Sequence, residues 1–226
     1  MRPLNFNTIL WIVTAILILF SLYLVFAWVP TEATMGIVQR IFYFHVPSAW
    51  VAFLAFFVVF LSSILYLAKR AVKWDTLAYC SAEIGVVFTS LALISGAVWA
   101  KPTWLSWWPW EDPRLTTTLM LWLIYIGYLL VRNYSPSHQS ARFAAVIGIA
   151  GFFDVPIIYL SVILWRSSHP LVFQPGPSSG LAPSMFLTLM VSLAAFTSLY
   201  VTLMRLVLSL RRAELEVEEL KIRIQD

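Results

Sequence analysis

The sequence contains little charge and only one cysteine. Of its 226 residues, 12% are charged and 61% are hydrophobic, and the mean hydropathy is +0.83. A soluble domain needs a charged surface, so this composition excludes that class and indicates a membrane protein. The single cysteine, Cys80, excludes an internal disulfide and every metal site that requires several cysteines.

Motifs of several common functions are also missing. The sequence contains no phosphate-binding or ATP-binding loop, and no serine or cysteine nucleophile paired with a base at one depth, so an enzyme of hydrolysis is not expected. It lacks the Cys-x-x-Cys-His sequence that attaches haem covalently. The basic residues behind the net charge of +4 are scattered among loops, so a nucleic-acid partner is not expected either.

Long apolar runs dominate what is present. A membrane-spanning helix needs about 20 mostly apolar residues, and these runs lack the polar alternation of a barrel. The sequence therefore predicts an all-α, polytopic membrane protein with six transmembrane helices. The predicted spans are 8–29, 46–68, 82–100, 116–132, 143–164 and 183–209.

The distribution of positive charge predicts the orientation of these helices. Eleven of the fifteen Lys and Arg residues lie on the inner side if the chain starts in the cytoplasm, which favours two cytoplasmic termini. The inner loops are then 69–81 and 133–142, both short and polar. The outer segments 30–45, 101–115 and 165–182 are rich in Trp, Pro and His, so we expect the functional site on the outer side.

The chain divides into a membrane part and a tail. Residues 1–210 form the predicted six-helix domain, with a tryptophan-rich outer loop at about 99–115, and residues 211–226 form a charged, helical, cytoplasmic tail. Apolar residues recur in the tail at the spacing of a coiled-coil seam. They are Leu206, Leu210, Ala213, Val217, Leu220 and Ile224. The seam fits either a helix that binds a partner or one that lies on the membrane lipid.

Two of the three histidines are predicted at one depth on the outer side. Pro47 is expected to open the second span, which places His45 at its outer mouth, and His169 follows the fifth span just before Pro170. Two neutral imidazoles can supply both axial ligands of one haem iron, whereas zinc needs further ligands. The alternative is that each is an interfacial hydrogen-bonding residue. His138 is expected to be solvated in an inner loop.

Tryptophan is concentrated in one outer loop, where five of the eleven tryptophans lie between Trp99 and Trp110. If the stretch from Trp104 is helical, Trp104, Trp107 and Trp108 share one face and form a flat apolar shelf. With Trp110, these residues would make a platform for a flat apolar ligand such as a porphyrin. The alternative is an aromatic belt at the membrane interface.

Charged residues near this loop and within the spans are further candidates. A guanidinium can hold a haem propionate, or pair instead with Glu111, Asp112 or a lipid phosphate. The outer-side arginines are Arg40, Arg114 and Arg166. Asp154 falls near the middle of the fifth span, where it should be neutral or paired, with a structural or a functional role.

Taken together, these motifs resemble cytochrome c maturation protein C, the CcmC family of haem-handling membrane proteins. The resemblance is carried by Gly36-Ile-Val-Gln-Arg-Ile-Phe-Tyr-Phe-His-Val-Pro-Ser-Ala-Trp50, the tryptophan loop, Asp154-Val-Pro-Ile-Ile-Tyr-Leu-Ser-Val162 and Arg166-Ser-Ser-His-Pro170. The tryptophan-rich element is shared with a wider superfamily of haem handlers. Six spans and a short chain are typical of the C member.

The resemblance implies a haem carrier rather than an enzyme. It implies that His45 and His169 are axial ligands of a haem b, the transported ligand, on the outer, periplasmic side of the bacterial inner membrane. The tryptophan loop would support this haem for loading onto a haem chaperone, protein E, during maturation of c-type cytochromes. The other implied partners are the membrane and ATPase subunits of an ABC transporter.

The loop departs from the family pattern Trp-Gly-x-Trp-Trp-x-Trp-Asp-x-Arg at two points. Leu105 stands where the pattern has glycine, and the run from Trp110 to Arg114 carries one extra residue. Either Glu111 or Asp112 therefore fills the aspartate position.

Two other functions compete with the carrier hypothesis. A permease subunit of an ABC transporter, passing haem across the bilayer, would need a polar path through the bundle. A b-type redox membrane subunit would usually have histidines deeper inside the spans, whereas both outer histidines are predicted at the membrane edge.

Overall fold

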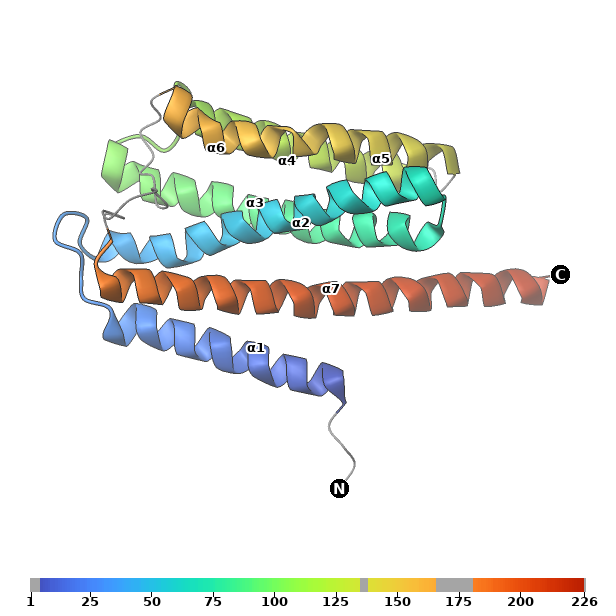
Figure 1. Ribbon diagram of the computed structural model, residues 1–226, viewed down its shortest axis with the longest axis horizontal. Coiled ribbons are helices and arrows are strands. Elements are labelled where there is room, and N and C mark those ends of the chain that lie inside the picture. The colour runs from blue at the N-terminus through green and yellow to red at the C-terminus, as the bar shows by residue number, and fades with distance from the viewer. Residues whose placement is uncertain (1–4, 135–137, 166–180, 226) are drawn as a thin grey trace.

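The computed structural model describes residues 5–134, 138–165 and 181–225, which form an elongated bundle of helices (Figure 1). Six helical segments in this described part are long and apolar enough to cross a membrane, so the predicted six-span, all-α membrane fold is confirmed. The helix bounds are Phe6–Tyr23 (α1), Phe42–Lys69 (α2), Val72–Trp104 (α3), Pro113–Tyr134 (α4), His138–Phe152 (α5), Asp154–Leu164 (α6) and Pro183–Gln225 (α7).

The bundle has two ends with different chemistry. We call the end that carries residues 105–112 the tryptophan end, and the end that carries the turn between α2 and α3 the basic end. In Figure 1 the basic end lies on the side toward which the C-terminus of α7 points. α2 packs against α3, α5 and α7, so it occupies the centre of the bundle.

The basic end is more helical than the sequence indicated. Only Arg70 and Ala71 separate α2 from α3, so the predicted inner loop 69–81 is wrong. Its polar residues extend the helix: Asp75 is buried in the first turn of α3 and accepts hydrogen bonds from Arg132 of α4, with Nε at 3.1 Å and Nη2 at 2.5 Å. A partner on a neighbouring helix thus permits a carboxylate where the sequence suggested a solvated loop.

Aromatic and small residues pack the centre of the bundle. The ring of Phe56 on α2 stacks on that of Tyr125 on α4, with centroids 3.7 Å apart. A Cβ added at Gly85 of α3 would lie 2.5 Å from a ring carbon of Phe56, so only glycine lets α3 approach so closely. Such small residues let membrane helices pack tightly without a hydrophobic driving force between them.

α1 packs on the outside of the bundle against α7 (Figure 1). Small hydroxyl side chains join the two helices: Thr14 lies 2.7 Å from Ser198 and 2.8 Å from Thr202, and Ser21 lies 2.9 Å from Ser192. Hydroxyl pairs of this kind satisfy polar groups where lipid offers no partner.

The fifth span is broken into two helices. α5 ends at Phe152 and α6 begins at Asp154, because Pro156 cannot donate the backbone hydrogen bond that would continue the helix. The Phe153 N–H donates instead to the Ala150 carbonyl at 3.2 Å. Asp154 Oδ2 is buried and has no hydrogen-bond partner in the described part of the chain.

α7 runs through the predicted tail without a break. It contains 43 residues, and at about 1.5 Å per residue it is about 65 Å long, roughly twice the thickness of a membrane core. It extends beyond the other helices at the basic end (Figure 1).

A tight turn leads the chain from α1 into α2. The Gly36 N–H donates to the Glu32 carbonyl at 3.1 Å, and Gly36 has φ 62°, a conformation that glycine adopts without a steric cost. The Glu32 carboxylate accepts the N–H groups of Met35 and Thr34, which lowers its pKa. A short 3-10 helix, η2 (Ile37–Ile41), then runs directly into α2.

Candidate functional site

His45 lies in the first turn of α2, at the tryptophan end of the bundle. The expectation that Pro47 opens this helix is wrong, because α2 begins at Phe42 and contains Pro47. The 3-10 helix η2 precedes α2, so the backbone is already helical before Pro47. The proline therefore removes only one backbone hydrogen bond within the helix. His45 therefore lies within the helix of the second span, as the fourth residue of α2, whereas the predicted span 46–68 began just after it.

Three residues of α3 hold the His45 ring. Nδ1 lies 3.1 Å from Ser95 Oγ. The Trp99 ring meets the imidazole edge to face, with centroids 5.8 Å apart and planes at 64°. A Cβ added at Gly96 would lie 3.0 Å from His45 Cε1, which is closer than most real contacts, so α3 passes directly beside the ring.

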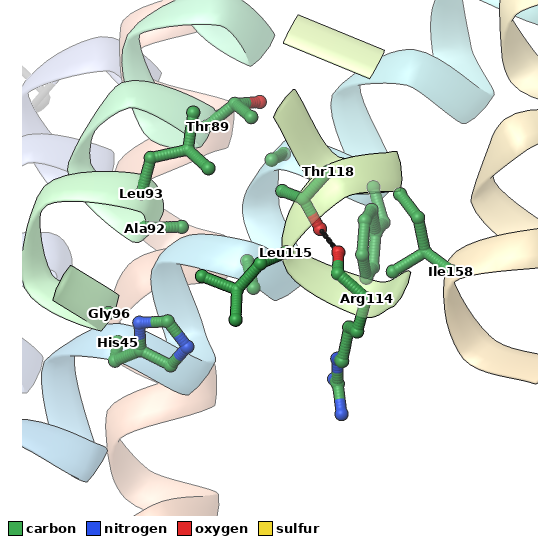
Figure 2. A pocket seen from close by; sticks show the side chains of 12 residues that line it. His45, Thr89, Ala92, Leu93, Gly96, Arg114, Leu115, Thr118 and Ile158 are labelled. Carbon is green, nitrogen blue, oxygen red and sulfur yellow. Dashed lines mark hydrogen bonds between the residues drawn. The ribbon is translucent and has the colours of Figure 1, made fainter. Parts of the chain in front are cut away.

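His45 and Arg114 line the same pocket (Figure 2). The pocket lies between α2, α3, α4 and α6, and its cavity has a volume of about 50 Å³. Its wall is mostly apolar, with Thr89 and Thr118 among the polar residues. A cavity of this size has room for a few water molecules but not for a porphyrin. A large flat ligand of His45 would therefore extend beyond this cavity.

Within the tryptophan loop, residues 105–112 are not helical. α3 ends at Trp104, and Leu105 adopts a left-handed conformation with φ 60° and ψ 10°. The helix on which a shared face of Trp104, Trp107 and Trp108 depended is therefore absent, and the predicted geometry of the shelf is wrong. A left-handed residue favours glycine, which gives a physical reason for the glycine of the family pattern at this position.

The loop tryptophans instead divide into exposed and covered side chains. Trp107 is 57% exposed and Trp110 is 70% exposed, whereas Trp104 and Trp108 are half-buried. Trp108 and Trp110 contact each other edge to face at 5.8 Å. Lys101 Nζ lies 5.9 Å from the centre of the Trp107 ring, within the range of a cation–π interaction. The exposed rings give the tryptophan end an apolar surface.

The two acidic candidates of the loop have different environments. Asp112 is buried and its Oδ1 accepts the N–H of Arg114 at 3.0 Å, so it caps the first turn of α4, which begins at Pro113. Glu111 is exposed. Asp112 therefore has the structural role in this loop and fixes the start of the helix that carries Arg114.

The structure separates the predicted arginines. Arg114 lines the pocket beside His45 (Figure 2). Arg40 lies elsewhere, 6.0 Å from the centre of the Phe26 ring, and its buried Nε has no hydrogen-bond partner in the described part of the chain. Arg166 lies outside the described residues, so its role as a propionate contact stays a prediction.

Of the other two histidines, only His138 lies within the described residues. His169, the second predicted iron ligand, lies outside the described residues. His138, which the sequence placed in an inner loop, is the first residue of α5. The joint role of His45 and His169 as iron ligands stays a prediction.

Sequence reasoning missed Ser95 and Gly96, and it did not connect Trp99 with His45. These residues lie on one side of α3 because helical positions i, i+1 and i+4 are close in space. No local pattern shows which neighbouring helix they face. The available signal was the position of Ser95 and Gly96 about one turn before Trp99, near the end of the predicted span.

The helices and the pocket define a class of protein: a multi-pass helical membrane protein with a histidine pocket at one end of its bundle. The sequence model of the family "Heme exporter protein C" matches residues 4–223 of the chain. The chain belongs to this family.

Curated relatives agree with this assignment. Heme exporter protein C of Bradyrhizobium diazoefficiens is 36% identical over 196 residues, covering 85% of this chain and 74% of the relative. The protein of the same name from Rhodobacter capsulatus is 30% identical over 216 residues, covering 93% and 88%. A ccmC-like mitochondrial protein of cytochrome c biosynthesis from Marchantia polymorpha is 32% identical over 181 residues, covering 80% and 73%.

Proposed function

We propose that this protein binds haem at its tryptophan end and passes it to a haem chaperone during the maturation of c-type cytochromes. The haem would be a haem b, held as a transported ligand and not as a catalytic group. His45 would be one axial ligand, His169 the other, and the exposed tryptophans would support the porphyrin. The names of the relatives support haem and cytochrome c biosynthesis as the setting.

The observation that carries the proposal is the position of His45. Its imidazole is held on one side by α3 and lines a pocket that Arg114 also lines (Figure 2). An imidazole nitrogen is a good iron ligand, and a guanidinium is a good propionate partner. The chemistry of this pair fits a porphyrin with iron at its centre and carboxylates at its edge.

The surroundings of the site also suit a ligand that is handed on. Trp107 and Trp110 are exposed, and the cavity beneath His45 is too small to enclose a porphyrin. A haem held at the mouth of the pocket would keep one edge accessible to a second protein. A permanent redox haem would instead be expected deeper between the helices, farther from the end at which His45 lies.

The orientation in the membrane is part of the proposal. The excess of Lys and Arg at the basic end favours that end in the cytoplasm, which places the tryptophan end on the periplasmic side of the inner membrane. Protein E would meet the haem there. The membrane and ATPase subunits of an ABC transporter are the partners that the family implies within the membrane and at the cytoplasmic side.

An optical titration tests the ligand assignment. The purified protein in detergent is titrated with haemin, and the Soret band is recorded for the wild type, His45→Ala and His169→Ala. We expect both variants to lose affinity and to shift or weaken the band, because each removes an axial ligand. His138→Ala is the matched control, since it removes a histidine from the start of α5, and its spectrum should equal that of the wild type.

The two ligand variants should also respond to added imidazole. A small imidazole molecule can occupy the space left by His45→Ala and return a nitrogen ligand to the iron. Recovery of the wild-type band on addition of imidazole would support direct ligation of the iron by His45. A wild-type spectrum in both alanine variants without imidazole would reject the ligand assignment.

A further inference from the structure

The hydrogen bonds of Ser95 bear on which nitrogen of His45 carries the proton. A serine hydroxyl has one proton to donate. Ser95 Oγ lies 2.6 Å from the Leu91 carbonyl oxygen and 3.2 Å from that of Ala92, both of which can only accept, so the Ser95 proton is directed to the backbone of α3. With its proton directed to the backbone, Ser95 Oγ is left to accept from His45 Nδ1, 3.1 Å away. This arrangement favours a neutral ring whose proton is on Nδ1.

We propose that Ser95 is a positioning residue that fixes His45 as the Nδ1–H tautomer, so that Nε2 carries the lone pair for iron. The role of Nε2 as an iron ligand rests on the proposed haem function. The tautomer itself is inferred from the Ser95 contacts alone. Metal-binding histidines commonly donate their other N–H to a neighbouring oxygen, which orients the ring and makes it a stronger ligand.

Gly96 and Trp99 complete the cradle around the ring. A hydrogen bond to Ser95 alone would allow the imidazole to rock about the Nδ1 contact. The close approach of Gly96 to Cε1 limits this motion on one side, and the edge-to-face contact with Trp99 limits it on another. Because all three residues lie on α3, the orientation of His45 is set by how α2 and α3 pack together.

The tautomer can be measured without haem. Protein carrying histidine labelled with ¹⁵N in the ring is studied by NMR at a pH at which the imidazole is neutral, and His45 is assigned from the signals that disappear in His45→Ala. We expect a pyrrole-type signal for Nδ1 and a pyridine-type signal for Nε2 in the wild type. Ser95→Ala should move the ring toward the opposite tautomer, and Ser95→Thr should keep the wild-type pattern because threonine retains the hydroxyl.

Ser90→Ala is a matched control on the same helix. Ser90 also donates to the carbonyl four residues earlier, that of Val86, at 2.8 Å, and it also accepts an aromatic N–H, that of Trp122, at 2.8 Å. It therefore makes the same kinds of bond as Ser95 but not to His45. Its removal should leave the histidine signals unchanged, which separates the effect of the His45 contact from the loss of any α3 serine.

Haem affinity gives a second readout. Loss of a neighbouring group that orients a metal ligand typically weakens binding by about 10–100-fold. We expect a loss of this size in Ser95→Ala, recovery in Ser95→Thr and no change in Ser90→Ala. Gly96→Ala, which pushes a methyl group against Cε1, should weaken haem binding while the Nδ1–H pattern persists in the apoprotein.

The two measurements separate failure of this inference from failure of the proposed function. If apo His45 is protonated on Nε2, or if Ser95→Ala leaves its nitrogen signals unchanged, the inference about Ser95 is overturned whatever the haem titration shows. If the Nδ1–H pattern and its loss in Ser95→Ala are both found but His45→Ala binds haem with a wild-type spectrum, the tautomer assignment stands and the ligand role of His45 fails.

Discussion

The two ends of the bundle satisfy their polar groups to different degrees. At the basic end, Asp75 accepts three hydrogen bonds from Arg132, and the Tyr79 hydroxyl donates to Asn133 at 2.8 Å. At the tryptophan end, the buried Nε1 atoms of Trp99 and Trp108 have no hydrogen-bond partner among the described residues. Toward the basic end, Trp74 Nε1 and Ser63 Oγ also have no hydrogen-bond partner in the described part of the chain.

This difference indicates a division of roles. Buried polar groups in folded proteins are normally paired, and unpaired ones often mark a place where a ligand or water completes the site. The tryptophan end also holds Leu105 in a left-handed conformation and leaves Trp107 exposed. We interpret the basic end as the end that stabilises the fold, and the tryptophan end as the end that keeps groups available for binding. Substitutions at each end can break or sharpen this comparison.

The largest effect on stability is expected at the basic end. Arg132→Ala would leave the Asp75 carboxylate buried without its partner, and loss of one member of a buried ion pair costs about 3–5 kcal/mol. Unfolding in mixed detergent micelles should show a loss of this order, while the Soret band of the remaining folded protein stays unchanged. A stability equal to that of the wild type would contradict the role assigned to this end.

A smaller effect of opposite sign is expected at Leu105. A left-handed conformation costs a residue with a side chain about 1–2 kcal/mol, and the greater freedom of glycine in the unfolded chain offsets about 0.4–1 kcal/mol of the relief. Leu105→Gly should therefore stabilise the protein by about 0.5–1 kcal/mol.

Leu105→Ala is the control for this substitution. Alanine removes most of the side chain but keeps the steric cost of the left-handed backbone, so it should give no gain in stability. The side chain of Leu105 is 83% exposed, so little packing is lost in either variant. Equal stabilisation by alanine and glycine would show that backbone strain is not the cause.

The smallest effect on stability is expected at the exposed tryptophan. Trp107→Ala should change the free energy of unfolding by about 0.5 kcal/mol or less, as is usual for an exposed position, yet it should weaken haem binding if the ring supports the porphyrin. Trp28→Ala is a suitable control, because Trp28 is also an exposed tryptophan, at 43%, but ends η1 (Leu24–Trp28), outside the loop. Equal haem affinity in the two variants would show that Trp107 does not support the porphyrin and is only an aromatic residue of the membrane interface.

The sequence was sufficient for the number of membrane spans, because each span is a long apolar run whose signal is local. It also indicated that His45 lies near the end of the second span. It misplaced the helix boundaries at polar residues: the segment with Asp75 was assigned to a loop because its partner, Arg132, is 57 positions away in the chain. A long-range ion pair leaves no local pattern.

The candidate site was only partly predictable for the same reason. Arg114 was named with two other arginines, and the fold distinguishes it by placing the start of α4 at the pocket that His45 also lines. Ser95 was not found, since its role depends on the packing of α3 against His45. The end of α3 at Trp104 was also missed, because leucine at position 105 gives no sign of the left-handed backbone that ends the helix.

The position of the iron in the haem-loaded protein tests the central claim most directly. A cryo-EM structure of the full chain in lipid nanodiscs with haem should place the iron within bonding distance of His45 Nε2, with the porphyrin over the mouth of the pocket and His169 on its other face. An iron bound at another site, with the His45 ring still resting on Ser95 and no contact to haem, would contradict the account.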